Sequence, residues 1–276
     1  MVKFISWNVG RRNEAWHSLL NTDADIALLQ EATEPPREVA DAVEIDPAPW
    51  KTAGAASNRY WRAAVVKLNQ NIDVQWLHGK AIVDAAPGEF AISRSGTVAA
   101  AIIRPADGDP VVVLSIYAAW EKPHSITDSH WIYADASAHR LISDLSTFIG
   151  RQNGHQILVA GDLNILHGYG EHGSRYWSSR YASVFSRMAA LGLPLVGPQA
   201  PGGRQAMPWP GELPEDSANV PTFYASHQSP STASRQLDFV FASRSMHDSL
   251  QVRALNRPDN WGPSDHCRVE IIWEGD

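Results

Sequence analysis

The sequence predicts a single α/β domain, with residues 1–276 forming one unit in which strands outnumber helices. Short apolar segments, several rich in β-branched residues, recur along the chain, and two segments carry apolar residues at helical spacing. No linker, repeat or low-complexity tail divides the chain. A length of 276 residues with 44% hydrophobic content is within range for one large domain with a real core.

The first half of the chain consists mostly of predicted strands. We expect them at residues 2–6, 25–31, 61–67, 72–77, 97–104 and 111–117. Residues 11–20 have helical spacing, and the acid-rich segment 34–46 predicts a solvated helix. Residues 107–110 (Asp-Gly-Asp-Pro) form a hairpin signal between the last two strands.

The second half contains the two strongest helical patterns, at residues 129–149 and 181–191, the latter ending at Gly192 in the expected cap position. Between them the apolar run 157–160 predicts a buried strand, and two further strands are expected at 237–241 and 267–273. Residues 197–221 are rich in Pro and Gly and almost without periodicity. This composition predicts a long ordered loop or a mobile flap.

Composition excludes several classes of function. The net charge of −7 argues against a generic nucleic-acid coating protein, although an enzyme with a local basic patch remains compatible with it. Cys267 is the only cysteine, which excludes an intrachain disulfide and a thiolate zinc site. The chain starts directly with a strand pattern and has no long apolar segment, so we expect a soluble, cytoplasmic protein that does not contact membranes.

Polar residues follow the buried strand at 157–160. Asp162 and Asn164 are separated by one apolar residue, and in an extended chain such residues point to the same side. The simpler explanation is an Asx-rich turn that closes the strand, and for this segment alone it is the favoured one. Partners elsewhere in the chain decide between a turn and a functional site.

Similar polar residues accompany other predicted strands: Asn8, Glu31, Tyr117, Asp238, and Asp265 with His266. Each has a structural explanation, such as a turn for Asn8, a helix cap for Glu31 or an ion pair between Asp238 and Arg235. However, a buried acid is costly unless it is paired or binds a metal. Six such positions in one chain are hard to assign to chance, so together they predict a functional site.

In chain order these positions form the motifs Ser-Trp-Asn, Leu-Gln-Glu, Ser-Ile-Tyr, Gly-Asp-Leu-Asn, Leu-Asp-Phe and Ser-Asp-His. The set resembles the endonuclease/exonuclease/phosphatase superfamily, which includes abasic-site endonucleases, pancreatic-type deoxyribonucleases, inositol polyphosphate phosphatases and neutral sphingomyelinases. The resemblance extends from residue 4 to residue 272. It implies a four-layer α/β/β/α sandwich of two mixed sheets flanked by helices, with the site at one end of the sheets.

The resemblance also implies a metal site. Glu31 would be the principal ligand, with Asn8 and Asp265 near or on the ion. These side chains offer hard oxygen donors, and no cluster of Cys or His competes with them. Oxygen ligands of this kind suit Mg²⁺, and Mn²⁺ is also possible.

The remaining matched residues have catalytic roles by the same resemblance. Asp162 would orient or deprotonate the attacking water, and Asn164 would hold that water or a phosphate oxygen. His266 would hydrogen-bond the phosphate, with Asp238 setting its tautomer, and Tyr117 would donate to the phosphate or the leaving oxygen. The reaction implied is in-line hydrolysis of a phosphate ester without a covalent intermediate.

The substrate is indicated by a basic and aromatic segment that follows the Asp162 strand. Its candidate binding residues are Arg175, Tyr176, Trp177 and Arg180, and Arg11 and Arg12 can add to the same rim. A solvated surface helix is the alternative for this segment. Together these residues favour a polyanion, most simply DNA or RNA, and hence a nuclease.

Two other functions stay open. One is a phosphatase or phosphodiesterase for a small phosphorylated molecule, and the other is an inactive relative that binds nucleic acid or a protein. Residues 222–227 (Thr-Phe-Tyr-Ala-Ser-His) depart from the Trp-rich segment usual in abasic-site endonucleases, which argues against that specificity. The cleavage mode, the number of metal ions and the oligomeric state do not follow from the sequence.

Overall fold

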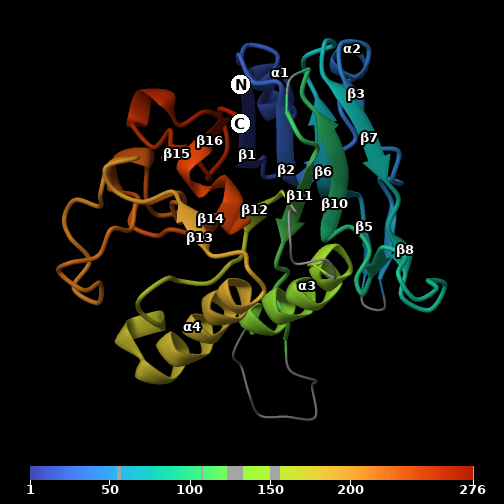
Figure 1. The fold of residues 1–276 in the computed structure, drawn as a ribbon. Coiled ribbons are helices and arrows are strands. Elements are labelled where there is room, and N and C mark those ends of the chain that lie inside the picture. The colour runs from blue at the N-terminus through green and yellow to red at the C-terminus, as the bar shows by residue number, and fades with distance from the viewer. Residues whose placement is uncertain (55–56, 107, 123–132, 150–155, 276) are drawn as a thin grey trace.

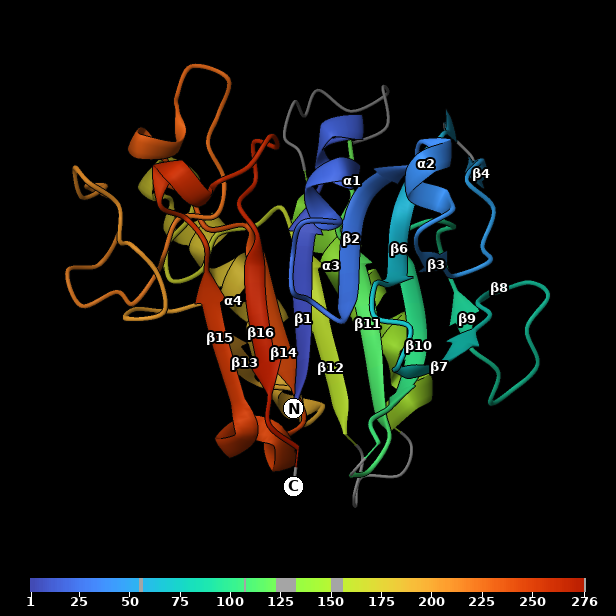
Figure 2. The same ribbon diagram turned by 90° about the horizontal axis from the view of Figure 1, so that it is seen from above.

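Two six-stranded mixed sheets pack face to face in the computed structural model, which describes residues 1–54, 57–106, 108–122, 133–149 and 156–275 (Figure 1). The first sheet has the order β15-β16-β1-β2-β6-β3 and the second the order β13-β14-β12-β11-β10-β7. Helices flank the pair of sheets (Figure 2). The predicted α/β/β/α sandwich is therefore confirmed.

The strands of the first sheet are β1 (Val2–Asn8), β2 (Ile26–Thr33), β3 (Glu44–Ile45), β6 (Trp61–Lys67), β15 (Leu250–Ala254) and β16 (Val269–Trp273). Those of the second sheet are β7 (Asp73–Leu77), β10 (Val98–Arg104), β11 (Val111–Tyr117), β12 (Ile157–Asp162), β13 (Leu195–Gly197) and β14 (Asp238–Ala242). Two small pairs add β4 (Thr52–Gly54) with β5 (Ser57–Arg59), and β8 (Lys80–Ala81) with β9 (Ala91–Ile92).

The α-helices are α1 (Asn13–Leu19), α2 (Arg37–Ala40), α3 (Ala134–Ile149) and α4 (Arg175–Ala190). Short 3₁₀ helices occur at Glu171–Gly173, Pro230–Thr232, Arg244–Ser249 and Pro258–Asn260. No helix in the described part of the chain is long and apolar enough to cross a membrane.

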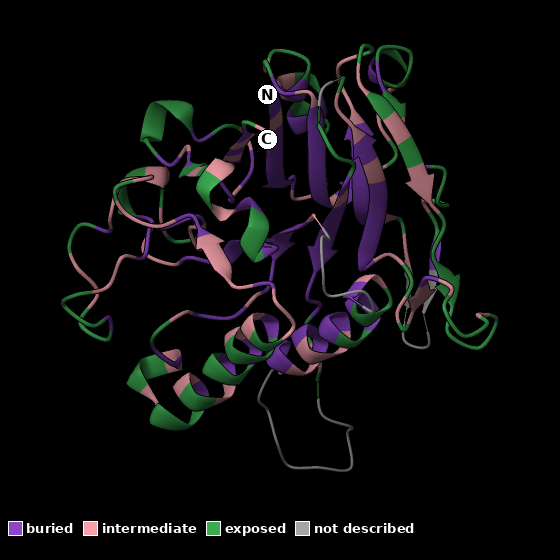
Figure 3. Ribbon diagram, viewed as in Figure 1, coloured by how far each residue is buried: buried purple, intermediate pink, exposed green. Residues whose placement is uncertain are grey.

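Alternating side chains separate the core into layers. In β1, Phe4 packs between the sheets, whereas Ile5 points to the outer face and packs with α1 residues such as Trp16. This is the twofold alternation of a strand that is covered on both faces. Helices α3 and α4 cover the outer face of the second sheet through residues such as Leu141 and Val184. The central strands, such as β1, β2, β11 and β12, are accordingly almost entirely buried, whereas the edge strand β7 is partly exposed (Figure 3).

Most predicted strands are present, but two helix predictions need correction. The helix expected over 34–46 is wrong beyond the four residues of α2, because Glu44 and Ile45 pair with β6 instead. Helix α4 begins six residues before the predicted start, with the Ser174 side chain accepting a hydrogen bond from the backbone of Trp177. Of the helix expected at 129–149, residues 129–132 lie outside the described residues, as does residue 107 of the hairpin signal.

The segment 197–221 is an ordered loop held by hydrogen bonds. The Asn256 side chain accepts a hydrogen bond from the backbone N–H of Arg204 and donates to its carbonyl, while Gln205 donates to the carbonyl of Ser217. Backbone groups removed from water need such partners, and side-chain amides supply them here. The loop packs beside β15, where the backbone of Ala254 donates to the carbonyl of Gly202, and beside Gln236 just before β14, whose side chain donates to the carbonyl of Pro198.

Gly161 permits the close approach of β12 to β11. A Cβ at this position would lie 1.9 Å from the carbonyl oxygen of Ile116. That carbonyl belongs to the parallel neighbour strand, whose register pairs Ile116 with Gly161 and Tyr117 with Asp162. The glycine therefore allows Asp162 to be aligned beside Tyr117.

We predict that Gly161→Ala destabilises the protein by about 1–3 kcal/mol, because the added methyl group has no space beside the β11 backbone. Urea unfolding followed by circular dichroism would measure the loss. Gly211→Ala is the matched control, since a Cβ at Gly211 meets nothing within 4 Å. Equal stability of the two variants would contradict the proposed close-approach role.

Candidate active site

A cavity of about 740 Å³ opens where the carboxyl ends of two parallel strand pairs, β1–β2 and β11–β12, lie opposite each other. Seven of the predicted catalytic and metal residues line it: Asn8, Glu31, Tyr117, Asp162, Asn164, Asp265 and His266. The eighth, Asp238, lies behind His266 and is buried. The fold thus brings residues 258 positions apart in the sequence into one cavity.

Three hydrogen bonds connect elements of the two sheets at this cavity. They join Asn8 Nδ2 to Asp162 Oδ2 at 2.9 Å, the Tyr117 hydroxyl to Glu31 Oε1 at 3.0 Å, and His266 Nδ1 to Asp238 Oδ2 at 2.8 Å. Each pairs a residue of the first sheet, or of the loop leading into β16, with a residue of the second sheet. The geometry of the cavity therefore depends on how the two sheets face each other.

Asp162 is a buried carboxylate with several donors. The Asn164 backbone donates to Oδ1 at 2.8 Å, and the Asn8 and Asn164 side chains donate to Oδ2 at 2.9 and 3.1 Å. The first of these bonds forms an Asx turn, so the turn interpretation of this motif is correct and is compatible with a functional one. Burial raises the pKa of Asp162 to about 7, and His266 and the hydrogen bonds oppose that rise.

His266 is fixed from several directions. Its carbonyl accepts a hydrogen bond from the indole of Trp7, and its ring stacks at an angle on Phe223 with centroids 4.9 Å apart. Burial by itself lowers the pKa of His266, but the charge and hydrogen bond of Asp238 raise it to about 10. The ring is thus cationic at neutral pH, and its Nε2 lies 3.9 Å from Asp162 Oδ2.

Two of the purely structural explanations are wrong. Arg235 does not pair with Asp238 but forms an ion pair with Glu171, with Nη2 and Oε2 2.9 Å apart. Glu31 does not cap α2, because the residue in the N-cap position is Pro36. Neither carboxylate is therefore explained by a purely local structural role.

Backbone strain also marks the cavity. Four non-glycine residues in the described part of the chain have positive φ: Arg11, Glu31, Asn164 and His172. All four line the cavity. Left-handed backbone is unfavourable for residues with a Cβ and is found preferentially at functional sites. His172 was not among the predicted residues, and nothing in its sequence context indicates a left-handed residue.

A sequence model of the Endonuclease/Exonuclease/phosphatase family matches residues 5–266. The chain belongs to this family. A comparison with curated protein sequences finds no match.

Solved structures resemble this member of the family over its whole length. An AP endonuclease from Leishmania major superimposes with a TM-score of 0.64 at 14% identity, covering 100% of this chain and 88% of the other. An AP endonuclease from Archaeoglobus fulgidus gives 0.62 at 14% identity, covering 99% and 100%. The 3′ phosphatase NExo from Neisseria, bound to product DNA hairpin, gives 0.58 at 17% identity, covering 99% and 100%. At these identities the likeness supports the fold alone.

The residues present fit the metal dependence that is typical of the endonuclease/exonuclease/phosphatase family. Glu31, Asn8 and Asp265 all line the cavity and offer hard oxygen donors. Among the described residues no three His, Cys, Asp or Glu side chains lie close enough together to hold a metal ion. The set proposed here differs from such a group because one of its three side chains is the amide of Asn8. The guanidinium of Arg11 contacts Glu31, with Nε and Oε2 3.1 Å apart.

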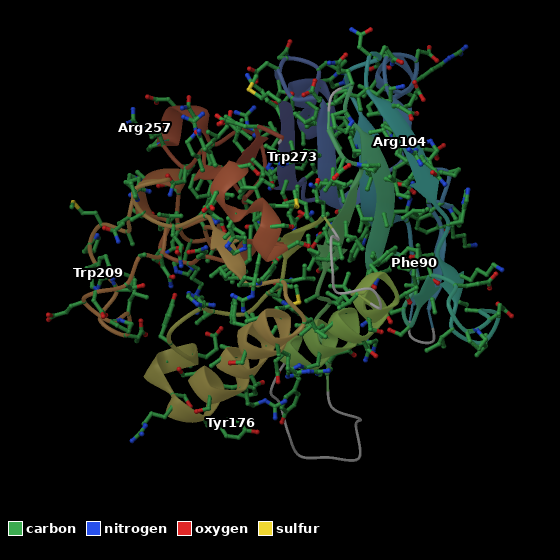
Figure 4. All side chains as sticks on the ribbon, in the orientation of Figure 1. Phe90, Arg104, Tyr176, Trp209, Arg257 and Trp273 are labelled. Carbon is green, nitrogen blue, oxygen red and sulfur yellow. The ribbon has the colours of Figure 1, made fainter. Side chains whose placement is uncertain are left out.

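The predicted substrate-binding residues are only partly at the cavity of this family member. Trp177 lines it, and Tyr176 and Trp177 line an adjoining cavity of about 410 Å³. Arg180 lines neither of the two cavities and forms an ion pair with buried Asp135 at 2.6 Å, and Arg175 also lines neither. Tyr176 is exposed on the outside of α4 (Figure 4).

Residues that the sequence did not indicate complete the cavity wall: Arg59, Trp61, Trp120, His172 and Phe223. The Trp120 side chain is 57% exposed, and its indole donates to Asn164 Oδ1 at 2.9 Å. The sequence signals that could have identified them are the Arg-Tyr-Trp run that contains Arg59 and Trp61, and the position of Trp120 shortly after Tyr117. These signals are weak, because such residues are common on surfaces.

We predict that Asp238→Asn lowers the pKa of His266 from about 10 toward or below the ordinary value near 6.5, since burial then dominates. NMR titration of the His266 ring would show no transition between pH 6 and 8 in the native protein and a clear one in the variant.

Asp144→Asn provides the control, because Asp144 is a buried carboxylate that binds Ser93 and does not contact His266.

The raised pKa of His266 also makes the stability of the fold depend on pH. Its contribution to stability is fully present below pH 6.5, the unfolded value, and is lost as the pH rises through about 10. If Asp238→Asn left the titration unchanged, the assigned role of Asp238 would be wrong.

Proposed function

We propose that this protein is a divalent-metal-dependent nuclease that hydrolyses phosphodiester bonds of DNA or RNA by in-line attack of water. The observation that supports the proposal best is the pairing of Asp162 with His266. A carboxylate whose pKa is near neutrality lies 3.9 Å from a cationic imidazole at the edge of one cavity. A proton acceptor and a phosphate-binding donor side by side are what hydrolysis by water requires.

Asp162 serves as the general base in this proposal. A pKa of about 7 leaves a large part of the carboxylate ionised at neutral pH while keeping it basic enough to accept a proton from water. Asn8 and Asn164 hold the carboxylate by their side-chain N–H groups. Water attacks the phosphorus as one of its protons passes to Asp162. The bond to the leaving oxygen breaks with its electron pair on that oxygen, which then takes a proton from solvent water.

His266 binds the phosphate. A distance of 3.9 Å is too long for a direct hydrogen bond between Nε2 and Asp162, so the Nε2–H can donate to a non-bridging phosphate oxygen. Asp238 accepts the hydrogen bond of Nδ1 and keeps the ring charged. The positive ring then stabilises the charge that builds on the phosphate during attack.

Tyr117 positions Glu31 in this proposal. Burial and the Glu31 charge raise the pKa of the Tyr117 hydroxyl, which therefore stays protonated, and its one hydrogen is donated to Glu31. Donation to phosphate or to the leaving oxygen would require this bond to break. Glu31, Asn8 and Asp265 would hold the ion, and Mg²⁺ bound there would neutralise charge on the phosphate oxygens.

A nucleic-acid substrate is supported by the walls of the cavity and by the structural relatives. Four arginines line the cavity, namely Arg11, Arg12, Arg59 and Arg235, together with exposed Trp120. Guanidinium groups near aromatic rings suit phosphates and bases. The relatives include AP endonucleases and the endonuclease domain of a telomere-specific non-LTR retrotransposon.

A small phosphoester is the second candidate, because a cavity of about 740 Å³ is within the usual size range of small-molecule pockets. Hydrolysis of small esters combined with inert plasmid, single-stranded DNA and RNA would favour it over the nuclease.

Asp162→Asn and His266→Ala should each lower the rate of metal-dependent hydrolysis by about 10²-fold or more, since each removes one group of the proposed proton-transfer and phosphate-binding pair. The assay would use single-stranded and plasmid DNA and RNA with Mg²⁺. Asp216→Asn, in the exposed part of the 197–221 loop, is the control. Near-native turnover by either folded variant would refute the assignment.

Removal of divalent metal by a chelator should abolish hydrolysis, and Mg²⁺ or Mn²⁺ should restore it. Glu31→Gln should raise the Mg²⁺ concentration needed for half-maximal activity by roughly tenfold or more, because an amide is a weaker ligand than a carboxylate. Titration calorimetry with Mg²⁺ gives a second measure that does not depend on turnover. Full activity in chelator would exclude metal dependence.

A further inference from the structure

One wall of the cavity contains a positive charge that has no carboxylate partner. Arg59 lies over the ring of Trp61, with its Cζ 4.7 Å from the ring centroid, and both residues line the cavity. Among the described residues no carboxylate lies within ion-pair distance of Arg59, whereas Arg11 on the same ring pairs with Glu31. Arg12, which also lines the cavity, has no carboxylate at ion-pair distance among the described residues either, so Arg59 and Arg12 are the two cavity arginines that an incoming anion can bind. Arg59 is the one held against an indole ring.

The surroundings of Arg59 add to this excess of positive charge. Glu121 is shared between Arg94 and Arg140, whose Nη1 atoms lie 2.8 and 2.6 Å from the same oxygen. Partial burial and the nearby Arg94 lower the pKa of Arg59, and the more distant charges of Glu31 and Glu121 only partly oppose that shift. An anion on this wall would relieve that repulsion.

The position of Arg59 relative to Tyr117 and Glu31 indicates which phosphate of a substrate it can reach. Trp61 contacts Tyr117 edge to face, with ring centroids 5.1 Å apart, and Tyr117 donates to Glu31. Arg59 is therefore separated from Tyr117 by one ring, beside the phosphate-binding centre but outside it. On the opposite wall Arg235 is neutralised by Glu171. Arg235 therefore adds no unpaired positive charge to the cavity, whereas Arg59 does.

We propose that Arg59, supported by Trp61, binds the phosphate next to the scissile one in a single strand of nucleic acid. This inference rests on the proposed nuclease function and deepens it. It makes Arg59 a specificity residue that favours a strand with a flanking phosphate over an ester with a single phosphate. A guanidinium stacked on an indole presents its N–H donors in a fixed plane, which suits bidentate phosphate binding.

The test uses a short single-stranded oligonucleotide in which either neighbour of the cleaved phosphate is replaced by an uncharged methylphosphonate. At one of the two positions the replacement should lower kcat/KM of the native protein by roughly tenfold or more, the worth of one charged hydrogen bond. Arg59→Ala should be slower on the normal strand by a similar factor and insensitive to the replacement. On bis(4-nitrophenyl) phosphate, which has no second phosphate, Arg59→Ala should lose a much smaller factor in kcat/KM than it loses on the normal strand.

Arg59→Lys provides a second variant that keeps the charge without the planar donors, and it should recover part of the sensitivity. Arg104→Ala is the control, because Arg104 is a partly exposed arginine (Figure 4) at the end of β10 opposite to the one that pairs near Tyr117. Circular dichroism confirms folding of each variant.

The outcomes separate the two proposals. If the replacement slows native protein and Arg59→Ala equally, or slows neither, the flanking-phosphate site is wrong while the nuclease function stands. If the native protein cleaves only the small ester, both are wrong. If it hydrolyses nothing in the presence of Mg²⁺, the proposed function fails, and the inference fails with it.

Discussion

The hydrogen bond from Asn8 to Asp162 is the contact on which the candidate site depends. It runs between the last residues of β1 and β12, which belong to different sheets, over a distance of 2.9 Å. A shift of one residue in the register of β1 would turn the Asn8 side chain to the opposite face of its sheet, and the same shift in β12 would do so for Asp162. The bond therefore requires both the register within each sheet and the facing of one sheet against the other.

Polar contacts deeper between the sheets support the same alignment. The Gln30 side chain donates to Ser115 Oγ at 3.0 Å, and Ser115 donates to the carbonyl of Leu29 at 2.6 Å. All of these groups are buried, where an unpaired donor or acceptor is costly. Gln30 and Ser115 precede Glu31 and Tyr117 in their motifs. Their hydrogen bonds therefore connect β2 with β11 next to the residues proposed to bind metal and substrate.

The cavity has two electrostatically different walls. On one side Arg235 and Glu171 form a balanced pair, and on the other Arg59, beside Trp61, has no carboxylate partner among the residues that the structure describes. The whole protein carries a net charge of −7, so attraction of a polyanion depends on this local distribution and not on the overall surface. Such a distribution suits an enzyme that engages its substrate at one cavity and not over its whole surface.

Local sequence information determined much of this protein. Strands β6 and β11 match their predicted ranges because each is a nearly continuous apolar run with β-branched residues, a signal carried by a few neighbouring positions. The order of the motifs indicated the family and the four-layer fold. Asp162 and Asn164 were expected to share one side of the chain, and the turn that joins them is local as well.

The tertiary structure alone decided which charges are balanced. Arg180 pairs with Asp135 on another helix, and Arg235 pairs with Glu171 and not with nearby Asp238. Residues 44–45 became a strand only because β6 offers an edge to pair with. The raised pKa of Asp162 follows from its burial between the sheets, and that of His266 from the charge and hydrogen bond of Asp238. These properties depend on groups distant in sequence, so no local pattern of residues encodes them.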